Sequence, residues 1–186
     1  QFGDDSALKE SGDDDRYFRY LIDRSFVAKG IGTVLTGSVR AGSIKTGSSL
    51  KHTASGEATK LRSARLDKTE LNEVYNGQRA AMNVSLDHKL VARGDWLIDE
   101  KLFHPINRLD ATVDFIDADF KLTSSAQYHV HIGASHHVVN IRHLGESLYQ
   151  VKCLESMIAH HGDRFIVRDP ASQHTLGGGR VVDIFI

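Results

Sequence analysis

The chain has 186 residues, a formal net charge of −1 at pH 7, 40% hydrophobic residues and 25% charged residues. This composition is typical of a globular protein with room for two ordinary domains, and no apolar run reaches the roughly 20 residues that a membrane-spanning helix needs. No secretory signal is recognisable, and the single cysteine, Cys153, excludes an internal disulfide bond. We therefore expect a cytoplasmic protein with no membrane contact. If it binds nucleic acid, a protein of this charge must gather its basic residues on one face.

The first half of the chain reads as a series of short strands. Residues 1–15 carry six acidic residues and have little apolar content, which predicts a solvated acidic linker. Between residues 16 and 103, apolar and polar residues alternate in short stretches separated by turn signals such as Asn76-Gly77 and Arg93-Gly94. The predicted strands cover 17–23, 32–39, 49–52, 57–66, 78–86 and 95–99. Segment 68–75 is predicted to be a loop. Many short strands at this spacing indicate an antiparallel β-barrel.

A second all-β unit follows a break at His104-Pro105, and residues 104–108 are the predicted linker between the two. Within 109–186 the predicted strands cover 109–116, 128–132, 135–143, 148–154, 164–168 and 180–186. The three consecutive glycines at 177–179 are interpreted as a turn between the last two strands. The predicted fold class is all-β, with two antiparallel β-barrels in tandem.

Two segments carry a family resemblance. The first, Asp23-Arg24-Ser25-Phe26-Val27-Ala28-Lys29-Gly30-Ile31-Gly32-Thr33-Val34-Leu35-Thr36-Gly37-Ser38-Val39, reads as two strands joined by a loop at 28–32 whose glycines permit positive φ. It resembles the second domain of the translational GTPases, the family of elongation factor Tu. The second segment, 162–183, resembles the last two strands of that family's third domain. Its triple glycine is the form typical of the selenocysteine-specific elongation factors. The resemblance covers roughly residues 16–186.

Motifs for nucleotide binding are missing from the sequence. It contains neither the Gly-x-x-x-x-Gly-Lys-Ser/Thr phosphate loop nor the Asn-Lys-x-Asp pattern that reads guanine. We therefore expect this chain to hold no cofactor and to perform no catalysis. The resemblance implies a fragment that begins just after a G domain, so that GTP and Mg²⁺ bind only to that missing domain. The full-length parent would then be a GTPase.

The resemblance also implies a binding pocket for the aminoacylated 3′ end of a tRNA. Phe26 and Thr36 match residues that enclose the terminal adenosine, and stacking of a base on an aromatic ring contributes about 1–3 kcal/mol. Asp23, Arg24 and Arg79 match the pocket for the amino acid. Arg24 departs from elongation factor Tu, which has an acidic residue there.

Two arginines suit a selenocysteyl group for a chemical reason. A selenol is much more acidic than a hydroxyl, so selenocysteine is largely an anion at neutral pH. Arg24 and Arg79 would attract that anion in a partly desolvated pocket but give no such advantage to a neutral seryl group. Asp23 would hold an arginine in place and offset part of the charge.

Further contacts with RNA are predicted on the second barrel. The family's third domain touches the T stem of the tRNA, and the loop from Arg168 to Arg180 is the candidate here. Such contacts involve phosphate and sugar and weaken with salt. The resemblance therefore implies selenocysteyl-tRNA and the ribosome as partners of a monomeric factor that acts at recoded UGA codons, with GTP as a partner only through the missing G domain.

The remaining chemistry in the sequence is weaker. Eleven histidines occur, most of them in the second half, and His129 and His131 would share one face of a strand. No recurrent cysteine or carboxylate partner predicts a metal site, and no Ser-His-Asp arrangement rises above chance. Two alternatives stay open: the same barrels from another elongation factor Tu-like or initiation-factor gamma-like GTPase, or a His-rich metal-binding β protein.

Overall fold

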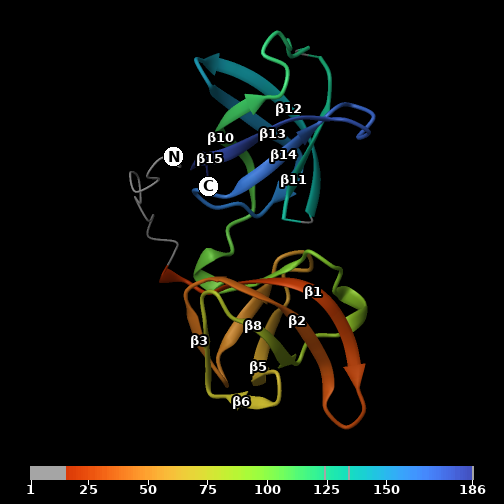
Figure 1. The fold of residues 1–186 in the computed structure, drawn as a ribbon, viewed down its shortest axis with the longest axis vertical. Helices are drawn as coiled ribbons and strands as arrows, with labels where there is room; N and C mark the ends of the chain where they lie inside the picture. Colours follow the sequence, from red (N-terminus) through yellow and green to blue (C-terminus); the bar gives the residue numbers. More distant parts are fainter. Residues whose placement is uncertain (1–15, 124, 134, 186) are drawn as a thin grey trace, which may run out of the picture.

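The computed structural model describes residues 16–123, 125–133 and 135–185, which form two β-barrels that follow one another along the chain (Figure 1). The predicted linker at 1–15 and the last predicted strand residue, 186, lie outside the described residues. The predicted fold class, two antiparallel barrels in tandem, is confirmed.

The first barrel closes in the strand order β4-β9-β1-β2-β8-β5, because β4 pairs with both β9 and β5. Its strands are β1 (Arg19–Ala28), β2 (Gly32–Ala41), β4 (Ser49–His52), β5 (Ala58–Leu66), β8 (Arg79–Val84) and β9 (Trp96–Ile98). The prediction of a loop at 68–75 is wrong. The segment contains two short strands: β6 (Thr69–Leu71) pairs with β5, and β7 (Glu73–Tyr75) pairs with β3 (Ser43–Lys45). Each of these two strands has only three residues, which is too short for an alternation of apolar and polar residues to be recognised in the sequence.

Alternation of side chains builds the core of this barrel. Along β2 every second residue is buried, from Thr33 to Ala41. The opposite side chains of β2 are half-buried or exposed on the outer face, as the two-residue period of a strand requires. The largest fully buried apolar side chains of this barrel are Phe18, Tyr20, Ile22, Leu35, Leu50, Leu61, Met82, Leu97 and Ile98. Each contributes about 1.5–3 kcal/mol through burial.

The second barrel has the order β10-β13-β12-β11-β14-β15 and closes between β10 and β15. Its strands are β10 (Ile106–Phe115), β11 (Tyr128–Ile132), β12 (Ser135–Gly145), β13 (Leu148–Met157), β14 (Arg164–Arg168) and β15 (Thr175–Ile184). Because β10 begins at Ile106, residues 106–108 of the predicted linker belong to a strand. Two short 3₁₀ turns, η2 (His88–Leu90) and η3 (Glu100–Leu102), lie in the connections on either side of β9.

The three glycines at 177–179 are not a turn, contrary to the prediction. They lie within β15, where they pair with residues 113–115 of β10 and with β14. A Cβ on Gly177 would lie 2.3 Å from the carbonyl oxygen of Asp114, and a Cβ on Gly179 would lie 2.4 Å from the ring of Phe165. The glycines therefore allow neighbouring strands and a core ring to approach β15. The turn itself is confined to residues 169–174, between β14 and β15.

An ion pair joins the two barrels. Arg19 of β1 contacts Asp163, just before β14, at 2.7 Å from Nη1 to Oδ1 and 2.9 Å from Nη2 to Oδ2. The guanidinium of Arg19 also lies 4.7 Å from the ring of Trp96, and the Nε2 atom of His160 lies 3.0 Å from the carbonyl oxygen of Leu102. The contacts of Arg19 with Asp163 and of His160 with Leu102 connect the second barrel to the first half of the chain, whereas Trp96 supports Arg19 from within the first barrel.

Throughout the part of the chain that the structure describes, no helix is long and apolar enough to cross a membrane.

Candidate functional site: an arginine-lined pocket on the first barrel

A β-bulge at Asp23 shapes the site. In the pairing of β1 with β2, Ile22 lies opposite Gly37 and Arg24 opposite Thr36, so Asp23 is an extra residue without a partner. A bulge bends the strand and redirects its side chains. Gly37 permits this close approach, since a Cβ there would lie 2.0 Å from the carbonyl oxygen of Leu21. Asp23 and Arg24, although adjacent in sequence, consequently both line the same pocket.

The pocket itself is small and strongly polar. It has a volume of about 340 Å³ and is lined by Asp23, Arg24, Arg79 and Arg93. Arg79 Nη2 lies 2.6 Å from Asp23 Oδ2, although 67% of the Arg79 side chain is exposed. With three guanidinium groups and one carboxylate, the lining carries a net positive charge and suits an anion.

A buried tyrosine connects the strands that carry the pocket residues. The Tyr20 hydroxyl lies 2.8 Å from the carbonyl oxygen of Ala80 and 3.1 Å from that of Leu35, so it ties β1 to β8 and β2. Burial, followed by the nearby charge of Asp23, raises the pKa of Tyr20 far above its usual value, against a smaller opposite effect of Arg79. The hydroxyl therefore stays protonated and available as a donor.

The two residues predicted to enclose an adenosine lie next to the pocket rather than in it. Thr36 is the direct cross-strand partner of Arg24, and Phe26 lies two residues further along β1, opposite Val34. Residues two apart on a strand share a face, so Phe26 and Arg24 lie on the same outer face. Phe26 is 45% exposed, which leaves it accessible to a planar ligand.

Sequence reasoning missed Arg93. It was interpreted only as part of a turn signal with Gly94, and nothing local indicates that this turn lies against β1. The attachment is made by the main chain, because Gly94 N donates to the carbonyl oxygen of Ile22 at 2.8 Å. Only that long-range contact could have identified the residue.

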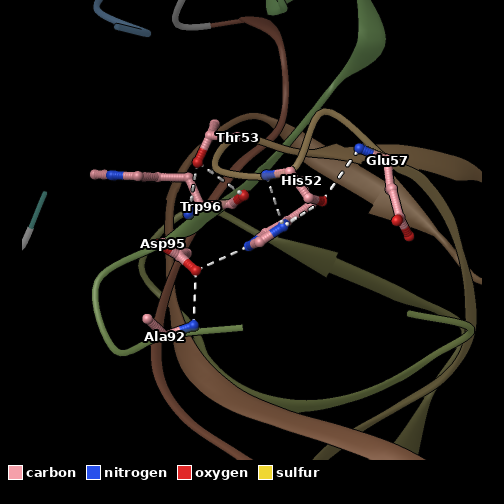
Figure 2. Close-up of polar contacts among 7 residues, drawn as sticks. His52, Thr53, Glu57, Ala92, Asp95 and Trp96 are labelled. Carbon is pink, nitrogen blue, oxygen red and sulfur yellow. Dashed lines mark hydrogen bonds and ion pairs between the residues drawn. The ribbon is translucent and has the colours of Figure 1, made fainter. Parts of the chain in front are cut away.

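Sequence reasoning also missed a buried polar arrangement in the same barrel. His52 Nδ1 lies 2.9 Å from Ser55 Oγ. On the other side of the ring, Nε2 lies 3.0 Å from Asp95 Oδ2 (Figure 2). These contacts bring a serine, a histidine and an aspartate together, although no catalytic signature of that kind was recognisable in the sequence. The His52 side chain is 0% exposed, so it cannot reach a leaving group. The arrangement is structural.

The two predicted T-stem arginines lie apart. Arg168 ends β14 and its Nη1 donates to the carbonyl oxygen of Ser172, whereas Arg180 pairs with Arg164 at the start of β14. Along a strand, four residues span about 13 Å. Because Arg180 belongs to β15, the predicted loop from Arg168 to Arg180 is shorter than expected.

Three histidines of the second barrel pack together. The rings of His129 and His136 stack with centroids 4.7 Å apart and are joined by a short contact from Nδ1 to Nε2, and His131 lies against His136. Burial, followed by the charges of His136, Arg168 and His129, lowers the pKa of His131. Within residues 16–123, 125–133 and 135–185, no group of three or more His, Cys, Asp or Glu side chains is arranged to hold a metal ion.

Comparison with known proteins agrees with these barrels. Residues 110–186 match the family described as "Selenocysteine-specific elongation factor, beta-barrel domain". The chain is 30% identical over 167 residues to the selenocysteine-specific elongation factor of Escherichia coli strain K12, covering 89% of this chain and 27% of that protein. It is 28% identical over 187 residues to the factor of Haemophilus influenzae, covering 95% of this chain and 30% of that protein.

The fold agrees as well. The crystal structure of a bacterial selenocysteine-specific elongation factor, EF-Sec, matches with a TM-score of 0.79 and 28% identity, covering 90% of this chain and 28% of that one. The SelB structure from Methanococcus maripaludis with a GTP analogue matches at 23% identity with a TM-score of 0.75, a likeness of fold alone. This chain thus spans less than a third of the length of its curated relatives. By sequence and fold together, it belongs to the selenocysteine-specific elongation factors, of which it carries the tandem β-barrels.

Proposed function

We propose that the arginine-lined pocket binds the selenocysteyl group at the 3′ end of its tRNA. The observation that supports this most is the meeting of Asp23, Arg24 and Arg79 around one cavity of about 340 Å³, with Asp23 and Arg79 in ion contact. Asp23 and Arg24 are neighbours at the bulge of β1, Arg79 begins β8, and the barrel brings the two strands together around the pocket. No second function has comparable support on this face.

The chemistry of the pocket favours an anion over a neutral group. Selenocysteine and serine have the same shape apart from one atom, but at neutral pH the selenol is largely ionised. Arg24 and Arg79 would bind the selenolate through charge-assisted contacts, each contributing about 1.5–3 kcal/mol where water is excluded. A seryl group would gain neither contact. Since specificity is a difference of affinities, the pocket would discriminate between the two aminoacyl forms of one tRNA.

The terminal adenosine would lie beside the pocket on the same outer face. Phe26 supplies an exposed ring for stacking, and Thr36 lies next to Arg24 on the adjacent strand. Phe26 would therefore contribute affinity without discriminating between amino acids, because the adenosine is present in every aminoacylated form.

The wider role follows from the family. The natural protein would be a monomeric cytoplasmic GTPase that delivers selenocysteyl-tRNA to the ribosome at recoded UGA codons. Its GTP and Mg²⁺ would bind to a G domain that is not part of this sequence. Arg168 and Arg180 would contact the T stem. These proposals are supported by the similarity to the two bacterial selenocysteine-specific elongation factors. This chain spans about 27–30% of their length, so the activity of the whole protein is inferred from them.

The test is a comparison of three ligands with the full gene product at one fixed salt concentration. We expect affinity to fall in the order selenocysteyl-tRNA, seryl-tRNA, deacylated tRNA. Phe26→Ala should weaken the two aminoacylated forms by the same factor, about 10-fold, because one stacking contact of about 1–3 kcal/mol is lost from each. Equal affinity of the unmodified protein for the selenocysteyl and seryl forms would contradict the proposed function.

A further inference from the structure

The pocket has a fourth lining residue, Arg93, which neither the sequence motifs nor the family resemblance indicated. It belongs to a tight turn at residues 92–95, between η2 and β9. Two main-chain hydrogen bonds attach this turn to β1: Gly94 N donates to Ile22 O at 2.8 Å, and Ile22 N donates to Asp95 O at 2.9 Å. Arg93 is thereby held beside the bulge that carries Asp23.

The side chain of Asp95 closes this turn from within. Its Oδ2 atom accepts a hydrogen bond from Ala92 N at 2.7 Å, and His52 Nε2 lies 3.0 Å from the same oxygen. Figure 2 shows the His52 ring directed at Asp95 and Asp95 directed at Ala92. One carboxylate oxygen therefore links the turn to the barrel core.

The tautomer of His52 follows from its other neighbour. Ser55 N lies 3.3 Å from His52 Nδ1, and a main-chain N–H can only donate. Nδ1 is therefore the acceptor, which leaves the proton on Nε2, where it is donated to Asp95. The His52 side chain is 0% exposed, so the donor of this bond is shielded from solvent. We call the chain His52–Asp95–Ala92 the turn anchor.

The charges of the pocket give Arg93 a role. Asp23 is engaged by Arg79 at 2.6 Å. Among the described residues, neither Arg24 nor Arg93 has an ion-pair partner. Arg24 and Arg93 are therefore the two cations of the lining whose charge is not offset by a contact, and both face the same cavity.

We propose that Arg93 is a third residue that binds the anionic aminoacyl group, and that His52 acts as a positioning residue for it through Asp95. The proposal rests on the proposed function of the pocket. A turn that is already fixed in the free protein loses little conformational entropy on binding, so the anchor raises the affinity that Arg93 can contribute. The alternative ligand for Arg93 is a phosphate of the RNA. Loss of a phosphate contact would weaken selenocysteyl-tRNA and seryl-tRNA equally, whereas loss of a contact with the anionic aminoacyl group would weaken only selenocysteyl-tRNA.

The experiment measures dissociation constants of the full gene product for selenocysteyl-tRNA and seryl-tRNA and compares their ratio. Arg93→Ala should lower the preference for the selenocysteyl form about five- to tenfold and leave seryl-tRNA binding nearly unchanged. Arg65→Ala is the matched control, because Arg65 is an exposed arginine of β5 outside the pocket lining. It should leave the ratio unchanged. Equal weakening of both forms by Arg93→Ala would assign Arg93 to a phosphate and overturn the proposal.

The positioning role is tested in the same assay. His52→Ala should lower the ratio, and His52→Gln, which retains a donor and an acceptor, should restore part of it. In the Arg93→Ala background His52→Ala should cause no further loss of ratio, since the two changes act through one group. Thermal unfolding of each variant identifies any that fail to fold, in which case His52→Gln carries the test. An additional, independent loss in the double variant would refute positioning through Arg93.

Failure of this proposal differs from failure of the proposed function. If the unmodified protein does not prefer selenocysteyl-tRNA, the function of the whole pocket is wrong. If Arg24→Ala lowers the ratio but Arg93→Ala does not, only the role of Arg93 is wrong.

Discussion

Arg19 and Asp163 lie on different barrels and meet in a two-point contact in which both side chains are nearly buried, with 12% and 11% of their surfaces exposed. A pair of this kind stabilises the arrangement only while both charges are present. Removing one partner leaves the other buried without compensation, which typically costs about 3–5 kcal/mol.

The first prediction concerns the pH dependence of this contact. Burial by itself would raise the pKa of Asp163, but its hydrogen bond with His160 and the charge and hydrogen bond of Arg19 outweigh burial and lower that pKa. An aspartate whose folded pKa is depressed contributes stability above its unfolded pKa of about 3.9 and loses it as the pH falls toward the folded value. Asp163→Asn should therefore lower the free energy of unfolding by about 3 kcal/mol at pH 7 and by progressively less below pH 4.

Urea unfolding of the 186-residue chain at several pH values measures this difference. Asp119→Asn is the control, because Asp119 is exposed and a surface change of this kind stays within about 0.5 kcal/mol. A pH-independent difference between Asp163→Asn and the unmodified chain would contradict the assigned role of the carboxylate.

The second prediction compares two adjacent glycines of β15. Gly179→Ala should destabilise the second barrel by about 3 kcal/mol, because the new Cβ would lie 2.4 Å from the Phe165 ring and 2.5 Å from Thr112 O. Gly178→Ala should cost less than about 1 kcal/mol, because its nearest neighbour would be Phe165 O at 3.4 Å. Thermal unfolding of both variants decides the matter, and similar melting temperatures for the two would argue against crowding at Gly179.

The third prediction concerns Cys153, which is buried beside Met157. Burial raises the pKa of its thiol to about 11. At pH 8 the reactive thiolate is then about a thousandth of the population. Alkylation of the folded chain should be at least about 100-fold slower than alkylation of the chain in denaturant. Comparable rates in the two states would show that the thiol is accessible.

The fourth prediction concerns the second barrel's contact with RNA. Arg168→Ala and Arg180→Ala should each lower affinity for selenocysteyl-, seryl- and deacylated tRNA alike. Each change should also reduce the slope of log K against log salt concentration by about one. Because Arg168 ends β14 whereas Arg180 lies on β15 opposite Arg164, at the start of β14, their effects should add. Filter binding across a salt series measures both quantities. A loss restricted to one aminoacyl form would be inconsistent with a backbone contact.

Local pattern was sufficient for much of the fold. The strands at 128–132 and 164–168 were predicted to the residue, because alternation is a local property of a strand with one buried face. The triple glycine shows the limit of this reasoning. Glycine by itself favours turns, and only the approach of Asp114 and Phe165 from other strands explains its presence inside β15.

The pocket residues also fall into those that the sequence could predict and those that it could not. Asp23 and Arg24 could be identified because the family motif runs through them, and Arg79 because its strand resembles the family's. Arg93 could not be identified, because its place depends on hydrogen bonds between residues 92–95 and β1, about 70 positions earlier in the chain. The tie between His52 and Asp95 is hidden for the same reason.

The central claim is that Arg24 and Arg79 recognise a selenolate, and one measurement tests it most directly. The ratio of affinities for selenocysteyl-tRNA and seryl-tRNA is determined for Arg24→Ala, Arg79→Ala and Phe26→Ala in the full gene product at one salt concentration. Each arginine variant should lower the ratio about 10-fold or more, since only the anion loses a charge-assisted contact, while Phe26→Ala should leave it unchanged. If both arginine variants retain the ratio of the unmodified protein, selenolate recognition does not occur in this pocket.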